Sequence, residues 1–438
     1  MDTILGLSPL AFIGIMMLFF LVMAMAGVGI AIALGITVLG ILVIVEDIPS
    51  MVVVQRIVAG CESFTLSAVP FFILAGELMN VGGITKRLVD FSKSLVGFIT
   101  GGLGHVVVVV NMIMAGVSGS ATADAAATGT ILIPALKKAG YPAPFSASLV
   151  SAACTIGPLI PPSIVFVILG SIAEISIGRL FLGGAIPGFV VGIALMIAVY
   201  IRAKRQKYVE KESFELKRLI KSTKDSILAL LMPVVVIGGM VFGIFTPTEA
   251  GVIGTVYGLI LGVFIYRELD LQGLKTVFQR AILLNARIMF IFGFASLLGW
   301  IFARESIPDL LMSLIMPIAS KPWSVMILLN SILFILGCVM EATSILIILG
   351  PLMLQLAGHF GIDPIHFGVV MCFNLLIALM TPPVGMAMFV TTSIGDVSIP
   401  DFTRAVIPFL ITMLLVLSLL IFIPQLVLYL PNTLMRGF

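Results

Sequence analysis

Apolar stretches of about 20 residues follow one another along almost the whole chain, separated by short groups of Gly, Pro, Ser, Thr and charged residues. A stretch of this length is sufficient for a helix to cross a bilayer. Backbone groups in lipid must be hydrogen-bonded within the protein, and the stretches lack the period-two alternation of a membrane β-barrel. We therefore predict an all-α polytopic membrane protein, with apolar segments at 9–45 (two spans, interrupted near Gly27 and Gly29), 57–79, 103–138, 145–174, 180–201, 226–245, 251–266, 288–303, 324–360, 365–395 and 405–430. The segments 84–100 and 270–287 are amphipathic, and we expect the first to lie along the membrane surface.

Four of these apolar segments are interrupted by a small polar or Pro-rich motif. The interruptions are GVSGSATADAAATGT (116–130), TIGPLIPPS (155–163), GCVMEATS (337–344) and MTPPVG (380–385). The residues that follow the two Pro-Pro pairs also correspond, because each pair precedes a Phe by 20 residues and another Pro by 26. Interrupted helices in corresponding positions of two halves indicate the binding site of a secondary transporter.

A hydrophilic segment at 202–225, with nine Lys or Arg residues, divides the chain. We predict a first half at 1–201 with a hairpin at about 103–138, a cytoplasmic linker at 202–225, and a second half at 226–438 with a hairpin at about 324–360. If both hairpins are re-entrant, 19 of the 24 Lys and Arg residues lie on the cytoplasmic side, as the positive-inside rule requires. The same count makes the two halves antiparallel, which predicts an inverted repeat with two re-entrant helical hairpins and broken helices.

Composition supports the membrane assignment, since 60% of the residues are hydrophobic and only 10% are charged. The net charge of +3 gives no indication of a nucleic-acid partner. The N-terminus lacks a basic region and a nearby cleavage motif, so we expect the start of a first span rather than a signal peptide. Four cysteines lie in apolar segments without metal-binding spacing, and three histidines (His105, His359 and His366) lie near segment ends, where we expect interfacial rather than catalytic roles.

The interrupted segments predict a site for an anion and cations. A hairpin tip inside a membrane exposes N–H and C=O groups that must contact protein or an aqueous cavity. Ser and Thr hydroxyls and the carbonyls that Pro leaves free are hard oxygen ligands suited to Na⁺, and half-helix N-termini attract a carboxylate. We therefore expect one Na⁺ site in each half, with the substrate between the two tips.

Several long runs resemble the large membrane subunit of TRAP (tripartite ATP-independent periplasmic) transporters. They include PFFILAGELMNVGGITKRLVDFSKSLVGFITGGLGH, AGVSGSATADAAATGTILIPALKKAGYPAPFSASLVSAACTIGPLIPPSIVFVILG, SIGRLFLGGAIPG, GIFTPTEAG and GIDPIHFGVVMCFNLLIALMTPPVG. The resemblance implies an elevator-type fold of the ion-transporter superfamily. It also implies Na⁺-coupled import of an organic acid, such as a C4-dicarboxylate or sialic acid, across a bacterial or archaeal cytoplasmic (inner) membrane. The implied partners are a small four-helix membrane subunit on a separate chain and a periplasmic substrate-binding protein.

The same resemblance assigns site residues where this sequence matches the family's motifs. For Na⁺ these are Ser118, Gly119, Ser120, Thr122, Thr155 and Gly157 in the first half and Thr343, Ser344, Met380 and Thr381 in the second. For the wall of the substrate cavity they are Ser120, Asp124, Pro162, Thr343 and Pro383. For Asp124 we favour a role as N-cap or first-turn carboxylate, because a carboxylate repels an anionic substrate. Glu341 stands where the family often has Asp, so the ligands of the second cation site stay open.

Two other interpretations compete with a tripartite transporter. One is a stand-alone Na⁺/carboxylate transporter of the same superfamily. The other is an intramembrane serine protease, because GVSG at 116–119 matches the GxSG motif of rhomboid-type enzymes. That chemistry needs a His within hydrogen-bond distance of the Ser, and none of the three histidines lies in the middle of a span. Glu77 and Glu249 are open between a functional and an interfacial role.

Overall fold

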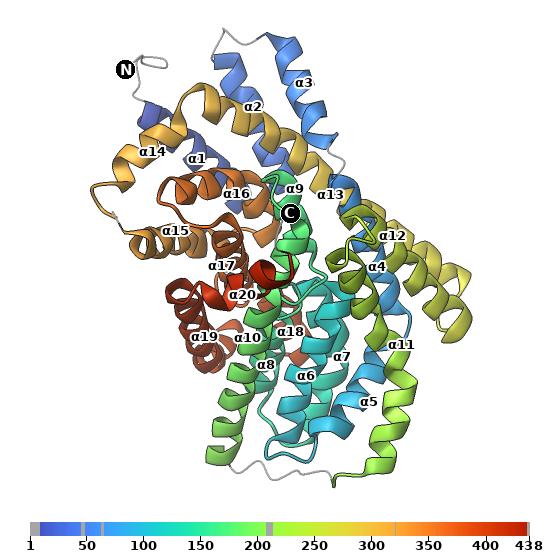
Figure 1. The fold of residues 1–438 in the computed structure, drawn as a ribbon. Helices are drawn as coiled ribbons and strands as arrows, with labels where there is room; N and C mark the ends of the chain where they lie inside the picture. The colour runs from blue at the N-terminus through green and yellow to red at the C-terminus, as the bar shows by residue number, and fades with distance from the viewer. Residues whose placement is uncertain (1–8, 45–48, 63–64, 207–212, 320, 436–438) are drawn as a thin grey trace.

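Helices joined by short breaks make up nearly all of the protein (Figure 1). The computed structural model describes residues 9–44, 49–62, 65–206, 213–319 and 321–435, and no strand occurs within these ranges. The helices of the first half are α1 (Pro9–Met25), α2 (Ile30–Ile44), α3 (Ser50–Cys61), η1 (Thr65–Ser67), α4 (Ala68–Val81), α5 (Ile84–Val96), α6 (Gly102–Ser118), α7 (Ala121–Lys138), α8 (Ala143–Cys154), α9 (Ile164–Ile172) and α10 (Ile177–Gln206).

The second half continues in the same way, with one π-helical turn. Its helices are α11 (Leu216–Val241), α12 (Pro247–Leu259), η2 (Ile260–Ile265), α13 (Leu271–Arg304), α14 (Ile307–Ile315), α15 (Pro322–Gly337), α16 (Ala342–His359), α17 (Pro364–Ala378), α18 (Met386–Gly395), α19 (Ile399–Phe422) and α20 (Gln425–Leu434). Among the described residues, six helices are long and apolar enough to cross a membrane, or seven spans if α4 and α5, bent by 67°, count as one. The prediction of an all-α polytopic chain is confirmed.

All four predicted interruptions are found between helices. The GVSGSATAD segment separates α6 from α7, and TIGPLIPPS separates α8 from α9. GCVMEATS separates α15 from α16, and MTPPVG separates α17 from α18. The second hairpin arms, α7 and α16, are both 18 residues long and each contains one Pro inside the helix. The order of elements therefore corresponds in the two halves.

The two halves interlock through reciprocal contacts. The second arm of the first hairpin, α7, packs on α18 of the other half, and the second arm of the second hairpin, α16, packs on α9. Each arm also packs on the helix that precedes the break in its own half, α8 or α17. The amine of Lys137, at the end of α7, donates to the carbonyl of Gly395 at the end of α18 (3.1 Å). The hairpins and broken helices thus form a single packed unit; the opposite orientation of the two halves stays a prediction.

A second group of helices lies beside this unit. Helix α4 packs on α12 and α13, and α13 packs on α2, α3 and α16. In Figure 1, α4, α11 and α12 lie on the right of the hairpin helices, and the long α13 crosses the top of the molecule. Helix α13 therefore contacts the hairpin unit along one side.

Several predicted segments differ from the observed helices. The predicted span at 57–79 is wrong, because α3 ends at Cys61 and α4 begins only at Ala68. The predicted span at 405–430 is likewise divided, because Pro424 follows α19 and a Pro removes a backbone donor. Helix α14 was not predicted, although Pro308 and Asp309 in its first turn are typical of a helix start.

The structure adds protein contacts for the amphipathic segment at 84–100, whose position at the membrane surface stays a prediction, and helices for the linker. The apolar face of α5, which includes Leu88 and Val89, is buried, and the helix packs on α6 and α11. Much of the predicted linker is helical, since α10 extends to Gln206 and α11 begins at Leu216. Residues 207–212 of the linker lie outside the described residues.

Candidate substrate and cation site

The first hairpin tip is a two-residue turn between α6 and α7. Gly119 adopts a left-handed conformation (φ 61°), and Ser120 is extended (φ −130°) as the N-cap of α7. A Cβ on Gly119 would lie 2.8 Å from the carbonyl oxygen of Pro162. Only Gly combines this backbone conformation with such a close approach. The tip is therefore in direct contact with the break between α8 and α9.

Asp124 links this tip to the same break from inside the protein. Its side chain is fully buried, and the Ser118 hydroxyl donates a hydrogen bond to Oδ1. The other oxygen, Oδ2, has no hydrogen-bond partner among the described residues. A Cβ on Gly157 would lie only 2.2 Å from Oδ2, so this oxygen contacts the break at Gly157. Asp124 is a first-turn residue of α7 as expected, but no side chain caps this helix, so a capping bond from Asp124 is not found.

The second tip is held to its own broken helix by the backbone. Val384 N–H donates to the carbonyl of Cys338 (3.0 Å), which joins the turn after α15 to the break between α17 and α18. The Ser344 hydroxyl, in the first turn of α16, is buried and has no hydrogen-bond partner among the described residues. The Thr381 hydroxyl donates to the carbonyl of Ile377 (3.0 Å), and the Met380 side chain is buried.

The two tips line one cavity of about 80 Å³. Its walls contain Gly119, Ser120, Ala121 and Thr122 from the first tip, Glu341, Ala342 and Thr343 from the second, Pro158, Ile164, Val165, Leu376 and Leu379 near the two breaks, and Leu284 and Ile288 from α13. We call it the tip cavity. Two elements more than 200 residues apart in the sequence, 119–122 and 341–343, therefore meet at one place.

Only some of the predicted site residues line the tip cavity. Ser120, Thr122 and Thr343 line the tip cavity, with Gly119. Ser118, Asp124 and Gly157 lie together behind the first tip. Asp124, Pro162 and Pro383, predicted for the cavity wall, are not among its lining residues. The hydroxyl of Thr155 donates to the carbonyl of Ala152 (2.7 Å).

Sequence reasoning missed two contributions to the tip cavity. Glu341 was noticed only as a departure from a motif, yet it lines the cavity. The wall formed by α13 was not predicted at all. The only signal was the amphipathic pattern at 270–287, which shows that one face of this helix is apolar but not what that face contacts.

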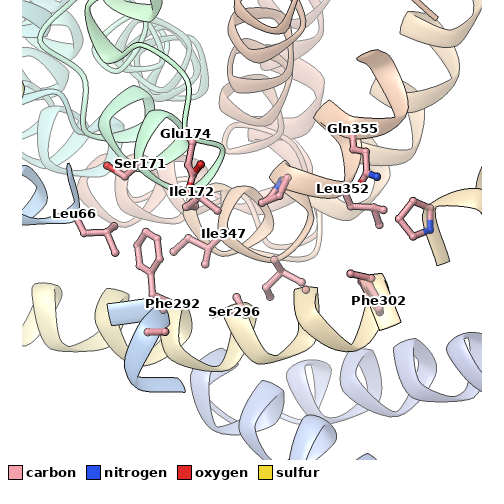
Figure 2. Close-up of a pocket in the computed structure, with 18 residues that line it drawn as sticks. Leu66, Ser171, Ile172, Glu174, Phe292, Ser296, Phe302, Ile347, Leu352 and Gln355 are labelled. Carbon is pink, nitrogen blue, oxygen red and sulfur yellow. The ribbon is translucent and has the colours of Figure 1, made fainter. Parts of the chain in front are cut away.

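A larger pocket of about 300 Å³ lies between α13 and α16 (Figure 2). Figure 2 shows Phe292 and Ser296 of α13 facing Ile347 of α16, with Glu174, which follows α9, beside Ile172 on the side opposite α13. Its lining contains one carboxylate, Glu174, and no basic residue, as does the lining of the tip cavity with Glu341, so charge among the lining residues does not distinguish the two. None of the predicted site residues lines it.

Three of the remaining polar candidates have structural partners. Glu249 forms a capping box with Thr246 at the start of α12, in which the Thr246 N–H donates to Glu249 Oε2 (2.8 Å). Nε2 of His105 pairs with the carbonyl of Thr100 (3.2 Å), and Nε2 of His366 pairs with the carbonyl of Leu420 (2.8 Å). The serine of the GxSG motif, Ser118, donates to Asp124. This serine thus has a carboxylate as its partner, where the protease interpretation requires a histidine.

Comparison with known proteins assigns the chain to a family. Residues 16–426 match the family model described as "Tripartite ATP-independent periplasmic transporter, DctM component". The chain belongs to the DctM family. Members of this family are transporter permease subunits and not enzymes, which excludes the protease interpretation. The DctM assignment, together with the apolar helices, identifies a multi-pass protein of the bacterial inner membrane.

Curated DctM relatives cover most of the chain. The sialic acid TRAP transporter large permease protein SiaM of Vibrio cholerae is 42% identical over 378 residues (86% of this chain, 88% of the relative). The 2,3-diketo-L-gulonate TRAP transporter large permease protein YiaN of Escherichia coli is 38% identical over 376 residues (86% and 88%). The crystal structure of the Alcanivorax borkumensis YdaH transporter is similar in fold, with a TM-score of 0.62 at 14% identity over 84% of this chain and 86% of YdaH.

Proposed function

We propose that this chain is the transport subunit of a tripartite system that imports an organic anion together with Na⁺. The tip cavity carries the proposal, because it unites both hairpin tips in one small space beside the two helix breaks. Relatives are named for sialic acid, C4-dicarboxylate and 2,3-diketo-L-gulonate, all of which are organic anions. We infer that a small carboxylate of this class binds between the tips. The proposed partners are a small membrane subunit and a periplasmic binding protein that delivers the substrate.

The first Na⁺ site is proposed behind the first tip. A fully buried carboxylate with one unpartnered oxygen is costly unless a cation balances it. The Ser118 hydroxyl, the Gly119 carbonyl and the backbone around Gly157 supply further oxygens of the hard type that Na⁺ prefers. Asp124 thereby moves from the proposed substrate wall to the proposed cation site, and Ser120 and Thr122 form the border between the two.

The second Na⁺ site is proposed at the other tip. The unpartnered hydroxyl of Ser344 and the hydroxyl of Thr343 lie at the start of α16, close in sequence to Glu341. We propose that the backbone of Met380 and Thr381 supplies carbonyl oxygens from the break that Val384 links to this tip. Glu341 itself, the N-cap residue of α16, lines the tip cavity.

The volume of the tip cavity supports a mechanism that requires movement. At about 80 Å³ it accommodates a few water molecules, whereas pockets that enclose small organic ligands measure roughly 300–1,000 Å³. The tips must separate from each other or from α13 before a carboxylate can enter. Because the hairpins and broken helices interlock, we propose that they move as one body along α13, as in an elevator mechanism.

Two Na⁺ ions supply enough free energy to accumulate a monoanion. Each positive charge that enters down 100 mV yields about 2.3 kcal/mol. A tenfold Na⁺ gradient adds about 1.4 kcal/mol for each ion. Import of a monoanion with two Na⁺ moves one net positive charge inward, so the membrane potential contributes to it. Import of a dianion with two Na⁺ moves no net charge, so only the Na⁺ gradient contributes.

Reconstitution in liposomes tests the proposed function. We expect uptake of a radiolabelled anion only when an inward Na⁺ gradient, the small subunit and the loaded binding protein are all present. Uptake by this chain alone would contradict the tripartite assignment and favour a stand-alone carboxylate transporter. Uptake that persists when K⁺ replaces Na⁺ would contradict Na⁺ coupling.

Ser120→Ala is expected to weaken Na⁺-dependent uptake without unfolding the protein. The Ser120 hydroxyl is half-buried at the tip, 3.4 Å from the Thr122 hydroxyl, and its loss removes a polar group from the border between the two sites. The measurement is initial uptake rate against Na⁺ concentration, with thermal stability as the control for folding. A wild-type Na⁺ dependence in this variant would remove Ser120 from the cation site.

A further inference from the structure

One face of α13 forms the wall of the tip cavity opposite the two hairpins. Leu284 and Ile288 of this helix line the cavity. Residues three positions apart lie on the same face of a helix, so Arg287 shares a face with Leu284, beside the lining residues of the cavity rather than among them. The Arg287 side chain is exposed rather than packed in the core. A cationic side chain is thus placed at the edge of the proposed substrate cavity.

The charge on the other side of the cavity is negative. Glu341 lines it from the second tip, and Arg287 attracts this carboxylate electrostatically. The other lining residues are uncharged. An anion in this cavity therefore meets one carboxylate that repels it and needs a positive group to offset that repulsion.

Arg287 has the chemistry for this task. A charged residue within a membrane-spanning helix is costly and usually faces the interior of the protein or an aqueous cavity, where it marks a substrate pathway. A guanidinium also presents its N–H donors in a planar fork that matches both oxygens of a carboxylate. The amphipathic pattern at 270–287 ends at this residue. No other Arg or Lys of α13 lies as close to Ile288 in the sequence.

We propose that Arg287 binds the acidic group of the transported anion, and that Glu341 is its partner when the cavity is empty. This inference rests on the proposed function, because it names the residue that recognises the substrate's charge. The arriving anion replaces Glu341 as the partner of the guanidinium. Binding then replaces one electrostatic partner of the guanidinium by another, which reduces the cost of desolvating the arginine.

Other charged groups of α13 provide the controls. Arg280 lies two turns earlier on the same face and attracts Glu77 of α4, so its removal would also alter a contact between two helices. Lys275 is exposed on the same helix, about 18 Å from Arg287 along the axis. Lys275→Gln removes the same charge from the same helix without altering the tip cavity, which makes it the matched control.

Uptake kinetics in proteoliposomes test the inference. We expect Arg287→Gln to raise the KM for a carboxylate substrate at least ~10-fold, while Arg287→Lys keeps it within a few-fold and Lys275→Gln leaves it unchanged. Glu341→Gln is expected to lower KM when Arg287 is present and to have no such effect in the Arg287→Gln background, as a coupled pair requires. Size-exclusion profiles and thermal unfolding show whether each variant is folded. If Arg287→Gln does not fold, Arg287→Lys still tests the inference through its KM.

The outcomes separate this inference from the proposed function. A wild-type protein that takes up no anion with any partner or ion would contradict the proposed function, and the inference with it. A wild-type protein that is active, combined with an unchanged KM in Arg287→Gln, would contradict the inference alone. Equal increases in KM for Arg287→Gln and Lys275→Gln would also contradict it, because they would indicate a general effect of surface charge.

Discussion

Asp124→Asn is expected to eliminate the response of the protein to Na⁺. The substitution keeps the size of the side chain and an oxygen for the Ser118 hydroxyl, but it removes the negative charge that the proposed cation balances. We expect the Na⁺ concentration for half-maximal uptake to rise at least ~10-fold, since even outer-shell partners of bound metal ions contribute 10–100-fold to affinity.

Thermal unfolding gives this prediction a second readout that does not depend on transport. A ligand that binds only the folded state raises its stability in proportion to the logarithm of ligand concentration above Kd. The wild-type melting temperature should therefore rise with Na⁺, and that of Asp124→Asn should not. In the absence of Na⁺ the variant should be at least as stable as the wild type, because it buries no uncompensated carboxylate.

Asp396→Asn is the matched control for this experiment. Asp396 is exposed after α18 in a left-handed conformation (φ 54°), which Asn also tolerates. The Asp396→Asn variant lacks one negative charge but is unchanged at both tips, so it should keep the wild-type Na⁺ response. A normal Na⁺ response in Asp124→Asn would remove this carboxylate from the cation site.

Gly119→Ala is expected to lower both stability and uptake strongly. A left-handed backbone costs a non-Gly residue about 1–2 kcal/mol, and the new methyl group would meet the Pro162 carbonyl at 2.8 Å. The contact is with backbone, which cannot rotate away, so the tip or the break must shift. A displaced tip alters the cavity and the proposed cation site together.

Gly140→Ala separates backbone strain from displacement of the tip. Gly140 is also left-handed (φ 86°), but a Cβ there would meet no atom within 4 Å. We expect this control to lose stability only by the amount of the backbone strain and to keep its uptake rate. The measurements are the melting temperature and the initial uptake rate of both variants. Equal losses at the two positions would show that the contact between the tip and the break has no special importance.

The sequence was sufficient to predict the breaks because their signals are local. Each Pro-Pro pair, 161–162 and 382–383, removes two neighbouring backbone donors and so favours a break, and a Gly such as Gly119 permits the left-handed turn of a tip. The resemblance to the family assigned Ser120 and Thr343 to the cavity wall, whereas the meeting of the two tips was predicted from the corresponding order of the two halves. That inference needed only the expectation that both tips lie at the same depth.

Contacts between distant segments could not be predicted in the same way. The role of Asp124 depends on Gly157, and the charge of the tip cavity depends on Glu341 of one hairpin and Arg287 of another helix. No local sequence pattern indicates which face of α13 contacts the two tips. The break between α3 and α4 was missed because the segment at 57–79 is apolar enough to be mistaken for one span.

The central claim is that the anion binds between the two tips, and a cryo-EM map tests it most directly. The sample is this chain with its small subunit in lipid nanodiscs, with Na⁺ and with an anion identified by its stabilisation of the cognate binding protein. The account predicts that, relative to a map without the anion, new density appears between 119–122 and 341–343, next to Arg287. Density in the pocket between α13 and α16, near Ser296 and Gln355, with an unchanged tip cavity would contradict it.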